Sequence, residues 1–273
     1  MAKLEVVPKQ PDLWAQLRVA AEDAAREEPR LASQLNAVVL AHEDFAGALS
    51  FQIARKLGDA ELGAMTVREV ALSAFAADPG IVAAAEADLK AVQERDPAIR
   101  SLLQPFMYFK GFQALQAWRV AHWLWEQDRD TLAFHFQSRI SELFQLDIHP
   151  AARIGSGVFL DHGTGIVIGE TAVIGDEVSM LHAVTLGGTG AERGDRHPKI
   201  GRGVLLGAGA KVLGNITVGD YAKVASGSVV LKPVPAGCTV AGVPARLVNC
   251  PTDATPARTM DHTLSDIVYD FVI

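Results

Sequence analysis

The sequence has few cysteines, no excess of basic residues and no long apolar run. Its two cysteines, Cys238 and Cys250, are too few for a disulfide framework and their spacing matches no zinc motif, so we expect two reduced thiols. Lysine and arginine together number 25 against 32 acidic residues, which gives a formal net charge of −7. A nucleic-acid-binding protein would need a clustered basic face, so this balance argues against a nucleic-acid partner.

Segments for membranes and export are missing too. No stretch of about 18 apolar residues is present that could form a spanning helix, and no amphipathic stretch is rich in lysine and arginine. Residues 1–9 lack the uninterrupted apolar core of a signal peptide. With 273 residues, of which 49% are hydrophobic, the chain is long enough for one large or two moderate cores. We therefore expect a cytoplasmic, globular protein without a membrane partner.

The residues from about 10 to 146 have the pattern of helices. Asp78 before a proline predicts a helix start, because aspartate caps helices and proline suits the first helical position. The same helix should end near Asp96, since a residue before proline avoids the helical region. Thr66 and Glu69 have the spacing of a capping box and predict another start at Thr66. Apolar residues recur at helical spacing in three stretches, 82–92, 112–125 and 132–143.

After residue 147 the pattern becomes a repeat of six. Twelve of the repeated positions are Ile, Leu or Val and one is Ala: Ile148, Ile154, Leu160, Ile166, Ala172, Val178, Val184, Ile200, Leu206, Val212, Val218, Val224 and Val230. A period of six fits neither a helical face nor a two-residue alternation. It fits a parallel β-solenoid whose coils have three flat faces, with one inward aliphatic residue on each face.

The repeat is interrupted once. Between Val184 and Ile200 the spacing is sixteen residues instead of six, so a polar loop over residues 188–199 must leave the solenoid. Insertions in solenoids concentrate on functional faces, so this loop is the first place to look for chemistry.

Several strings along the chain are similar to those of one family. They are Arg-Asp-Pro-Ala at 95–98, Lys-Gly-Phe-Gln-Ala-Leu-Gln at 110–116, Asp-Ile-His-Pro-Ala-Ala at 147–152, Asp-His-Gly-Thr-Gly-Ile at 161–166, Gly-Asp-Arg-His-Pro-Lys-Ile at 194–200 and Ala-Gly-Val-Pro-Ala-Arg at 241–246. Through them the chain resembles the bacterial serine acetyltransferases, which belong to the left-handed β-helix acyltransferases. The resemblance implies an α+β fold: a helical domain over 1–146, a left-handed parallel β-helix over 147–250 and a flexible tail over 251–273.

The resemblance also implies a reaction, the direct transfer of an acetyl group from acetyl-CoA to the hydroxyl of L-serine, a step of cysteine biosynthesis. A hydroxyl is a poor nucleophile and needs a base. His162 matches the base of the family, and Asp147 matches the carboxylate that orients this base. The backbone N–H of Gly188 matches the donor to the developing oxyanion. Without the motifs, His162 would be an ordinary surface residue and Gly188 an ordinary corner glycine.

Serine carries an ammonium and a carboxylate group, so its pocket needs charges of both signs. Asp96 and Asp161 resemble the family's contacts to the amine. Arg196 and His197 resemble its contacts to the carboxylate, where a guanidinium group fits two oxygens. The residues alone leave other roles open: Asp96 as a turn residue, Asp161 as a corner residue bonded to local amides, and Arg196 as a solvated loop charge.

Acetyl-CoA is the expected co-substrate, and no metal is expected. The resemblance places acetyl-CoA in the groove between neighbouring solenoids of a homotrimer. Ala208 and Gly209 leave room there for the pantetheine arm, and Lys223 and Lys232 are candidates for contacts to its phosphates. Small corner residues and solvated lysines explain these four equally well.

The resemblance carries expectations about assembly and regulation as well. The helical domain is similar to the part that joins two trimers into a hexamer. The C-terminal Ile273 matches the anchor that inserts into O-acetylserine sulfhydrylase, a capture of a terminal carboxylate with an aliphatic side chain. L-cysteine is the expected feedback inhibitor at the serine site.

Three other interpretations stay open. A γ-type carbonic anhydrase shares the solenoid and would hold zinc with three histidines; the candidates are His149, His162, His182 and His197. Another hexapeptide acetyltransferase would take a sugar acceptor, although such enzymes generally lack the long helical domain. A non-catalytic scaffold would use only its tail, and the intact pair of His162 and Asp147 argues against it.

Overall fold

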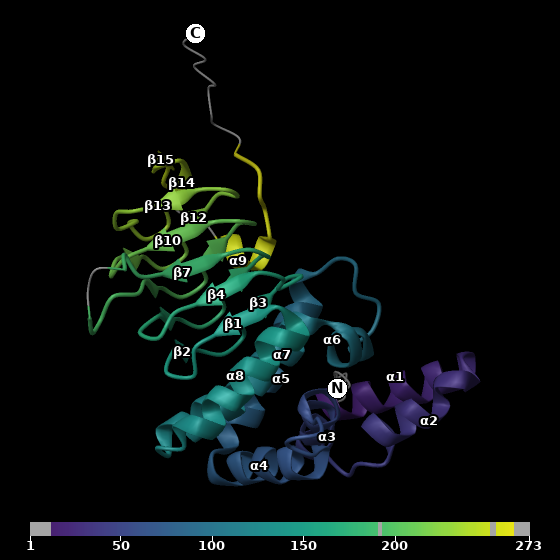
Figure 1. The fold of residues 1–273 in the computed structure, drawn as a ribbon. Helices are drawn as coiled ribbons and strands as arrows, with labels where there is room; N and C mark the ends of the chain where they lie inside the picture. The colour runs from purple at the N-terminus through teal and green to yellow at the C-terminus, as the bar shows by residue number, and fades with distance from the viewer. Residues whose placement is uncertain (1–11, 191–192, 252–254, 265–273) are drawn as a thin grey trace, which may run out of the picture.

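The computed structural model describes residues 12–190, 193–251 and 255–264, in which a helical part precedes a β-solenoid (Figure 1). The solenoid coils are stacked above helices that cover one of its ends, and α1 and α2 lie farthest from it. The helices are α1 (Leu13–Glu27), η1 (Pro29–Leu31), α2 (Ala32–Leu35), η2 (Asn36–Leu40), α3 (Phe45–Leu57), α4 (Ala64–Ala77), α5 (Pro79–Arg95), α6 (Leu103–Tyr108), α7 (Lys110–Glu126), α8 (Asp130–Phe144) and α9 (Pro256–Thr259).

The helix signals in the sequence were correct at α5 and wrong at α4. Asp78 caps α5 by accepting a hydrogen bond from the backbone N–H of Gly80 at 2.8 Å, and the helix ends before Asp96. The start predicted at Thr66 is wrong, because α4 begins two residues earlier with Gly63 as its N-cap. Alanine and methionine at the next two positions favour the helix, so Thr66 lies within the first turn.

Within the described residues, no single helix has both the length and the apolar composition of a membrane span. Only α4 and α5 taken together meet those criteria, and they are bent by 100° relative to each other.

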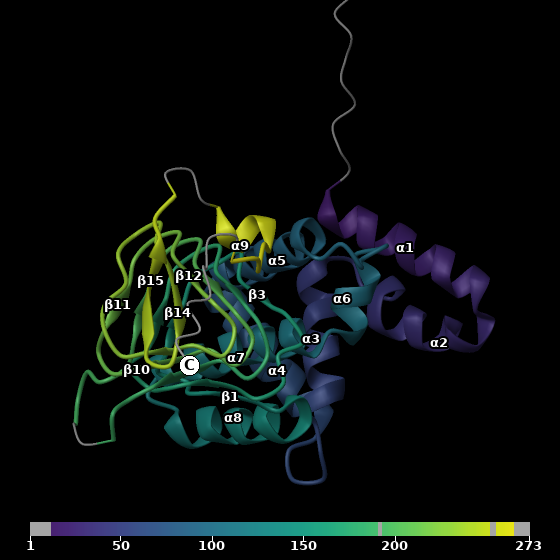
Figure 2. The ribbon, with the colours of Figure 1, turned by 90° about the horizontal axis from the view of Figure 1, so that it is seen from above.

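The strands form three sheets, one on each face of the solenoid (Figure 2). The five-stranded sheet contains β1 (Leu146–Ile148), β4 (Ile166–Ile168), β7 (Thr185–Gly187), β10 (Lys211–Leu213) and β13 (Val229–Val230). The four-stranded sheet contains β2 (Arg153–Ile154), β5 (Val173–Ile174), β8 (Lys199–Ile200) and β11 (Thr217–Val218). The six-stranded sheet contains β3 (Phe159–Leu160), β6 (Ser179–Met180), β9 (Leu205–Leu206), β12 (Lys223–Val224), β14 (Thr239–Gly242) and β15 (Ala245–Asn249).

Successive coils pair in parallel, and the five strands of one sheet correspond to about five coils. Twelve of the thirteen aliphatic residues of the repeat are buried, and the other, Ile154, packs against the same core. This confirms the predicted fold class, a helical part followed by a parallel β-helix. The frame breaks where expected, because the chain leaves the solenoid after Gly187 and returns at Lys199.

Three corners join the sheets. The first corner leads from the six-stranded to the five-stranded sheet and includes residues 161–165, 181–184 and 207–210. The second leads from the five-stranded to the four-stranded sheet and includes 169–172 and the loop after β7. The third leads from the four-stranded to the six-stranded sheet and includes 155–158, 175–178, 201–204 and 219–222.

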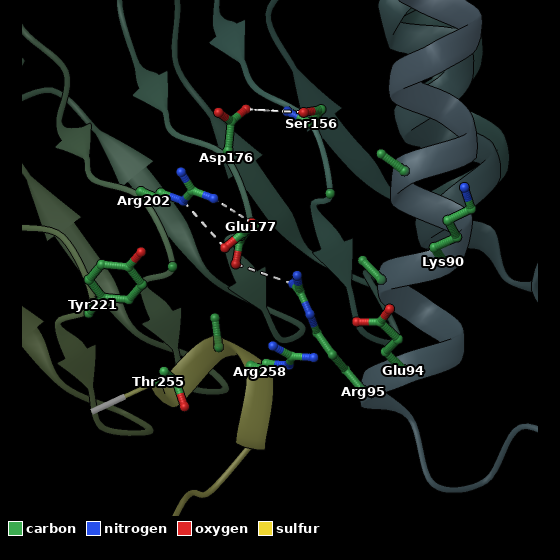
Figure 3. A pocket seen from close by; sticks show the side chains of 15 residues that line it. Lys90, Glu94, Arg95, Ser156, Asp176, Glu177, Arg202, Tyr221, Thr255 and Arg258 are labelled. Atoms are coloured by element: carbon green, nitrogen blue, oxygen red, sulfur yellow. Dashed lines mark hydrogen bonds and ion pairs between the residues drawn. The ribbon is translucent and has the colours of Figure 1, made fainter. Parts of the chain in front are cut away.

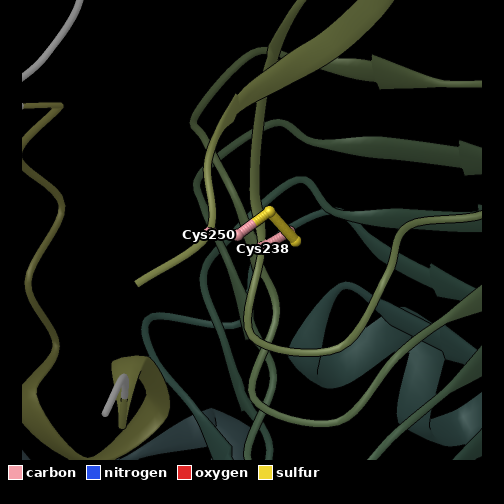
Figure 4. The surroundings of a disulfide bond; sticks show 2 residues. All are labelled: Cys238 and Cys250. Atoms are coloured by element: carbon pink, nitrogen blue, oxygen red, sulfur yellow. A yellow bond between two sulfur atoms is a disulfide. The ribbon is translucent and has the colours of Figure 1, made fainter. Parts of the chain in front are cut away.

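The prediction of two reduced thiols is wrong, because Cys238 and Cys250 form a disulfide (Figure 4). The strands β14 and β15 pair in an antiparallel hairpin that directly follows one cysteine and directly precedes the other. The pairing brings their Cα atoms to 4.0 Å. The sequence carries no hairpin signal that we recognised here, so nothing in it brought the two cysteines together.

The chain after the hairpin folds back along the solenoid. The helix α9 packs against α5, and the hydroxyl of Ser179 donates a hydrogen bond to the backbone carbonyl of Ala257 at 2.8 Å. Farther along, the ammonium group of Lys223 donates to the carbonyl of Thr263 at 2.7 Å. The described part of the tail, residues 255–264, therefore lies against the six-stranded sheet and the end of α5.

Candidate active site

Three of the predicted site residues meet at the first corner, where β3 ends. Asp161 and His162 directly follow this strand, with the imidazole Nε2 of His162 3.7 Å from Oδ1 of Asp161. The His162 side chain is 71% exposed and that of Asp161 only 22%. His162 has a φ of +57°, a left-handed backbone conformation that residues other than glycine adopt uncommonly. The corner thus presents an imidazole to solvent beside a partly buried carboxylate.

Asp96 is the third residue at this corner. It is the C-cap of α5, and its carboxylate accepts a hydrogen bond from the backbone N–H of Ala98 at 2.8 Å. Burial raises the pKa of Asp161, nearby His162 lowers it, and the negative charge of Asp96 raises it again. The two carboxylates therefore lie close enough to repel each other, an arrangement that a cation between them would relieve.

The sequence analysis did not assign a second histidine of this corner to the site. His182 occupies the same position as His162 one coil farther along, since Leu160 pairs with Met180. The two imidazole rings lie edge to face with their centroids 5.8 Å apart. A period of six gives a coil of eighteen residues and would align residue 162 with residue 180, so the repeat gave no signal for this neighbour. The observed spacing of twenty residues between paired strands brings His182 beside His162.

The other predicted polar contacts lie at the second corner. The guanidinium of Arg196 forms an ion pair with Glu170, with Nη2 2.6 Å from Oε2, and this hydrogen bond holds the pKa of Glu170 below its usual range. A Cβ placed on Gly188 would come within 3.3 Å of the Arg196 side chain. The predicted oxyanion donor and the predicted carboxylate contact are thus neighbours.

His197 is buried at the same corner, with 6% of its surface exposed. Its Nδ1 accepts a hydrogen bond from the backbone N–H of Thr171 at 3.1 Å. A backbone N–H can only donate, so the neutral ring carries its proton on Nε2. Burial lowers the pKa of His197, and Arg196 lowers it further, which favours this neutral form.

Thr171 also fixes the end of the protruding loop. Its hydroxyl oxygen accepts hydrogen bonds from the backbone N–H groups of Arg196 and His197, at 3.0 and 3.1 Å. The sequence analysis missed Thr171 and Glu170. They follow β4 and become neighbours of the loop only when the coils stack.

Within one chain the two corners are separated by a face of the solenoid. The strand β4 lies between them, and its coil needs four residue steps from Gly165 to Gly169, about 13 Å of extended chain. Asp147 lies on this face, on the exposed side of β1, where its carboxylate accepts a hydrogen bond from the side chain of Gln137 at 2.7 Å. Within the described residues of one chain, the His162 imidazole thus lies beside the carboxylate of Asp161, whereas the carboxylate of Asp147 is hydrogen-bonded to Gln137 of α8.

The four residues assigned to acetyl-CoA fall in different surroundings. Ala208 and Gly209 belong to the first corner, and the backbone N–H of Gly209 donates to the carbonyl of His182 at 2.9 Å. Lys223 is 9% exposed and is held by Thr263 of the tail, which does not leave its ammonium group open to a phosphate. Lys232 is exposed after β13. Ile273 lies outside the described residues.

The four histidines weighed for a zinc site are divided between the corners. His162 and His182 are at the first corner, whereas His149 and His197 are near the second. Among the residues that the structure describes, no three or more His, Cys, Asp or Glu side chains are grouped to hold a metal ion. Within one chain, the described residues therefore do not bring together the three histidines that a carbonic anhydrase site requires.

Two family models match the chain. The model described as serine acetyltransferase, N-terminal, matches residues 13–117, and the model described as bacterial transferase hexapeptide (six repeats) matches residues 197–232. The first match covers helices from α1 into α7, and the second covers the later coils of the solenoid.

Curated relatives and solved structures agree with these matches. The serine acetyltransferase of Escherichia coli strain K12 is 52% identical over 259 residues, covering 95% of each chain. The serine acetyltransferase of Brucella abortus strain S19, solved in complex with coenzyme A, is 50% identical with a TM-score of 0.86, covering 89% of this chain and 98% of that one. A serine acetyltransferase of Neisseria gonorrhoeae solved in complex with serine is 50% identical with a TM-score of 0.85, covering 87% and 98%. A further serine acetyltransferase in complex with cysteine is 49% identical with a TM-score of 0.90, covering 92% and 97%.

Proposed function

This chain belongs to the serine acetyltransferase family, and we propose how its own residues carry out the reaction of that family. The reaction moves an acetyl group from acetyl-CoA to the hydroxyl of L-serine and yields O-acetylserine and free CoA. The observation that carries the proposal is the exposed imidazole of His162 beside the partly buried carboxylate of Asp161, with Asp96 near enough for its charge to act on that carboxylate. At this corner, carboxylates that can bind the ammonium group of serine lie next to an imidazole that can accept the proton of its hydroxyl group.

In the proposal, His162 is the general base. Its imidazole is exposed and therefore reaches a bound substrate without a change of the solenoid. It removes the proton of the serine hydroxyl as the oxygen attacks the thioester carbonyl, and it returns the proton to the leaving thiolate of CoA. A positioned base of this kind contributes about 10²–10⁴ in rate. The attack is direct, with no acetyl group carried on the protein.

The ammonium group of serine binds between Asp96 and Asp161. Support comes from the raised pKa of Asp161, which is due first to burial and then to the negative charge of Asp96; a bound cation would offset the repulsion between the two carboxylates. The side chain of serine then extends from its Cα toward the neighbouring imidazole. Asp147 orients His162 in the proposal, although it must exchange its hydrogen bond with Gln137 to do so.

The carboxylate of serine binds at the second corner, to Arg196 and to the Nε2–H of His197. Thr171 supports this role because it fixes the neutral tautomer that can donate from Nε2. Glu170 holds the guanidinium of Arg196 until the substrate carboxylate arrives. The backbone N–H of Gly188 is the proposed donor to the oxyanion that forms on the thioester carbonyl.

We propose a trimer because the two corners lie on opposite sides of one solenoid face and cannot both contact one serine molecule. Residues that lie on opposite sides of one solenoid face do not bind the same small molecule within one chain, but the corners of neighbouring solenoids can meet in a cyclic assembly. We propose that His162 of one subunit faces Arg196 of the next, with acetyl-CoA in the groove beside Ala208 and Gly209. The helical domain joins two such trimers into a hexamer.

The remaining parts of the proposal concern regulation and location. L-cysteine shares the ammonium and carboxylate groups of serine, so it competes for the same residues, and a related enzyme has been solved with cysteine bound. The C-terminal Ile273 anchors O-acetylserine sulfhydrylase through its carboxylate and aliphatic side chain. The protein acts in the cytoplasm.

The test is release of CoA thiol by the purified full-length chain with acetyl-CoA and L-serine. His162→Asn should lower serine-dependent release by about 10²–10⁴. His182→Asn, which removes an equivalent ring from the same column, should keep most of the rate. Equal losses in both variants would refute the assignment of the base to His162. Trapping of a labelled acetyl-protein after a rapid quench would refute the direct attack.

A further inference from the structure

A pocket at the third corner of the solenoid plays no part in the reaction described above. It has a volume of about 490 Å³ and lies between α5, the third corner and α9 (Figure 3). The residues proposed for the reaction lie at the other two corners and, for Asp147, on the five-stranded face between them. The volume falls within the range of natural binding sites for small molecules, about 300–1,000 Å³.

The pocket is positively charged in a protein that is negatively charged as a whole. Four cationic and three acidic side chains line it, whereas the formal net charge of the chain is −7. Two of the acidic groups already have partners within the pocket. Arg202 forms an ion pair with Glu177 at 2.6 Å, and Asp176 accepts hydrogen bonds from the backbone and the hydroxyl of Ser156. The cations that remain are Lys90, Arg95 and Arg258, with Glu94 as the remaining acid.

Arg95 is the buried member of this set, with 9% of its surface exposed. One end of its guanidinium donates to the hydroxyl of Ser179 at 3.0 Å and to the carbonyl of Glu177 at 3.2 Å. Its Nε is buried without an acceptor among the described residues. Arg95 lines the pocket, so it brings to the wall a guanidinium whose hydrogen bonds to the protein are incomplete.

A second guanidinium approaches Arg95 from a different part of the chain. Arg258 belongs to α9, and Figure 3 shows its side chain beside that of Arg95 in the pocket wall. Burial lowers the pKa of Arg95, the neighbouring glutamates raise it, and the positive charge of Arg258 lowers it. Two like charges from separate elements are thus held near each other, and an anion between them would convert repulsion into attraction.

We propose that this pocket binds the oxyanion group of a small organic anion, a carboxylate or a phosphate, between Arg95, Arg258 and Lys90. Guanidinium groups bind both kinds of oxyanion through paired hydrogen bonds, and an ammonium group adds a point charge. The rest of the volume, toward Tyr221, accommodates the organic part of the molecule. A bound anion would fasten α9 to α5 through Arg258 and Arg95, and Arg95 directly precedes Asp96.

The experiment is isothermal titration calorimetry of the full-length protein at constant ionic strength, without serine or acetyl-CoA. Inorganic phosphate and succinate serve as separate probes, and the tighter one identifies the group that the pocket prefers. We expect saturable binding of at least one probe. Arg258→Gln and Lys90→Gln should each weaken it tenfold or more, since both residues are exposed and their loss should leave the fold intact.

Arg129→Gln is the matched control, because it removes the same charge from an exposed arginine between α7 and α8. It should leave binding unchanged. Absence of saturable binding by both probes would overturn the proposal, and so would an equal loss in the control. Displacement of the probe by saturating CoA would place it in the CoA site and would also overturn the proposal.

Hydrogen exchange is a second measurement. The bound probe should slow exchange of the backbone amides of α9, and unchanged exchange would contradict the proposed contact between the anion and Arg258. Neither measurement depends on acetyl transfer, so the result stands apart from that of the catalytic test.

Discussion

Arg119 and Asp88 form an ion pair in the interior of the protein, with Nη2 of the arginine 2.7 Å from Oδ2 of the aspartate and side chains that are 7% and 0% exposed. Asp88 lies on α5 and Arg119 on α7. The other oxygen of Asp88 accepts a hydrogen bond from the backbone N–H of Val158, at the third corner, at 2.8 Å. Arg119 in turn donates to the carbonyl of Gly155 at 2.7 Å. One pair thus fastens two helices to the first coil of the solenoid and so positions Asp96, which ends α5.

Loss of the Asp88 carboxylate should destabilise the protein strongly. Asp88→Asn leaves the guanidinium of Arg119 buried without its counter-charge, which costs about 3–5 kcal/mol in comparable pairs. Thermal and urea unfolding at fixed protein concentration measure the change. The control is Asp23→Asn, which removes an exposed ion pair with Arg26 on α1 and should cost no more than about 1 kcal/mol. Similar losses in both variants would contradict the role given to the buried pair.

The close approach of α7 to the solenoid depends on Gly111. A Cβ at this position would lie 2.0 Å from the backbone carbonyl oxygen of Leu160, which cannot rotate away. We expect Gly111→Ala to destabilise the protein by about 1–3 kcal/mol or more, because the helix must move off β3. A change in the free energy of unfolding near zero would refute this. Gly63→Ala is the comparison, because a Cβ there meets nothing within 4 Å.

The solenoid was predictable because a period of six is visible along the chain without knowledge of any contact. Each aliphatic residue of the series could be predicted to be buried from its position in the repeat alone, and only Ile154 is less than fully buried. The disulfide was not predictable in this way, because Cys238 and Cys250 meet only through the β14–β15 hairpin. Asp88 gave no signal either. An aspartate within an apolar helical stripe looks the same in the sequence whether its carboxylate pairs with a buried arginine or faces solvent.

The motifs named candidate residues for the site, but they did not predict how these residues are grouped. Sequence spacing does not say which corner a residue occupies, and therefore gave no sign that Arg196 and His162 lie on opposite sides of one face. Lys223 was a candidate for phosphate contacts in the groove that the resemblance implies, whereas within the described chain its ammonium group donates to the carbonyl of Thr263. Thr171 and Glu170 escaped notice because their partners lie 25 to 26 residues farther along the chain.

The acid side of the pH profile should depend on the pair of Asp96 and Asp161. Burial and the charge of Asp96 both raise the pKa of Asp161, so this carboxylate takes up a proton at a higher pH than an ordinary aspartate. Binding of the serine ammonium needs the ionised form, so the affinity for serine, measured by calorimetry without acetyl-CoA, should fall as the pH drops through that raised pKa. Asp96→Asn should weaken binding and also move this fall in affinity to lower pH, because one cause of the raised pKa is removed. A fall in affinity that stays at the same pH would show that the charge of Asp96 does not act on Asp161.

Mixing two inactive variants tests whether the site spans two subunits. His162→Asn disables the first corner and Arg196→Gln the second, so each variant alone should show little serine-dependent release of CoA. If each site takes its base from one subunit and its guanidinium from the next, mixed trimers contain some sites with both residues intact. Refolding or co-expression at equal ratio should then restore about one quarter of the sites. The double variant His162→Asn/Arg196→Gln mixed with the protein carrying neither substitution is the control for dilution. Activity no greater than the sum of the single variants would mean that both corners serve one substrate within one chain, and the proposed subunit arrangement would then be wrong.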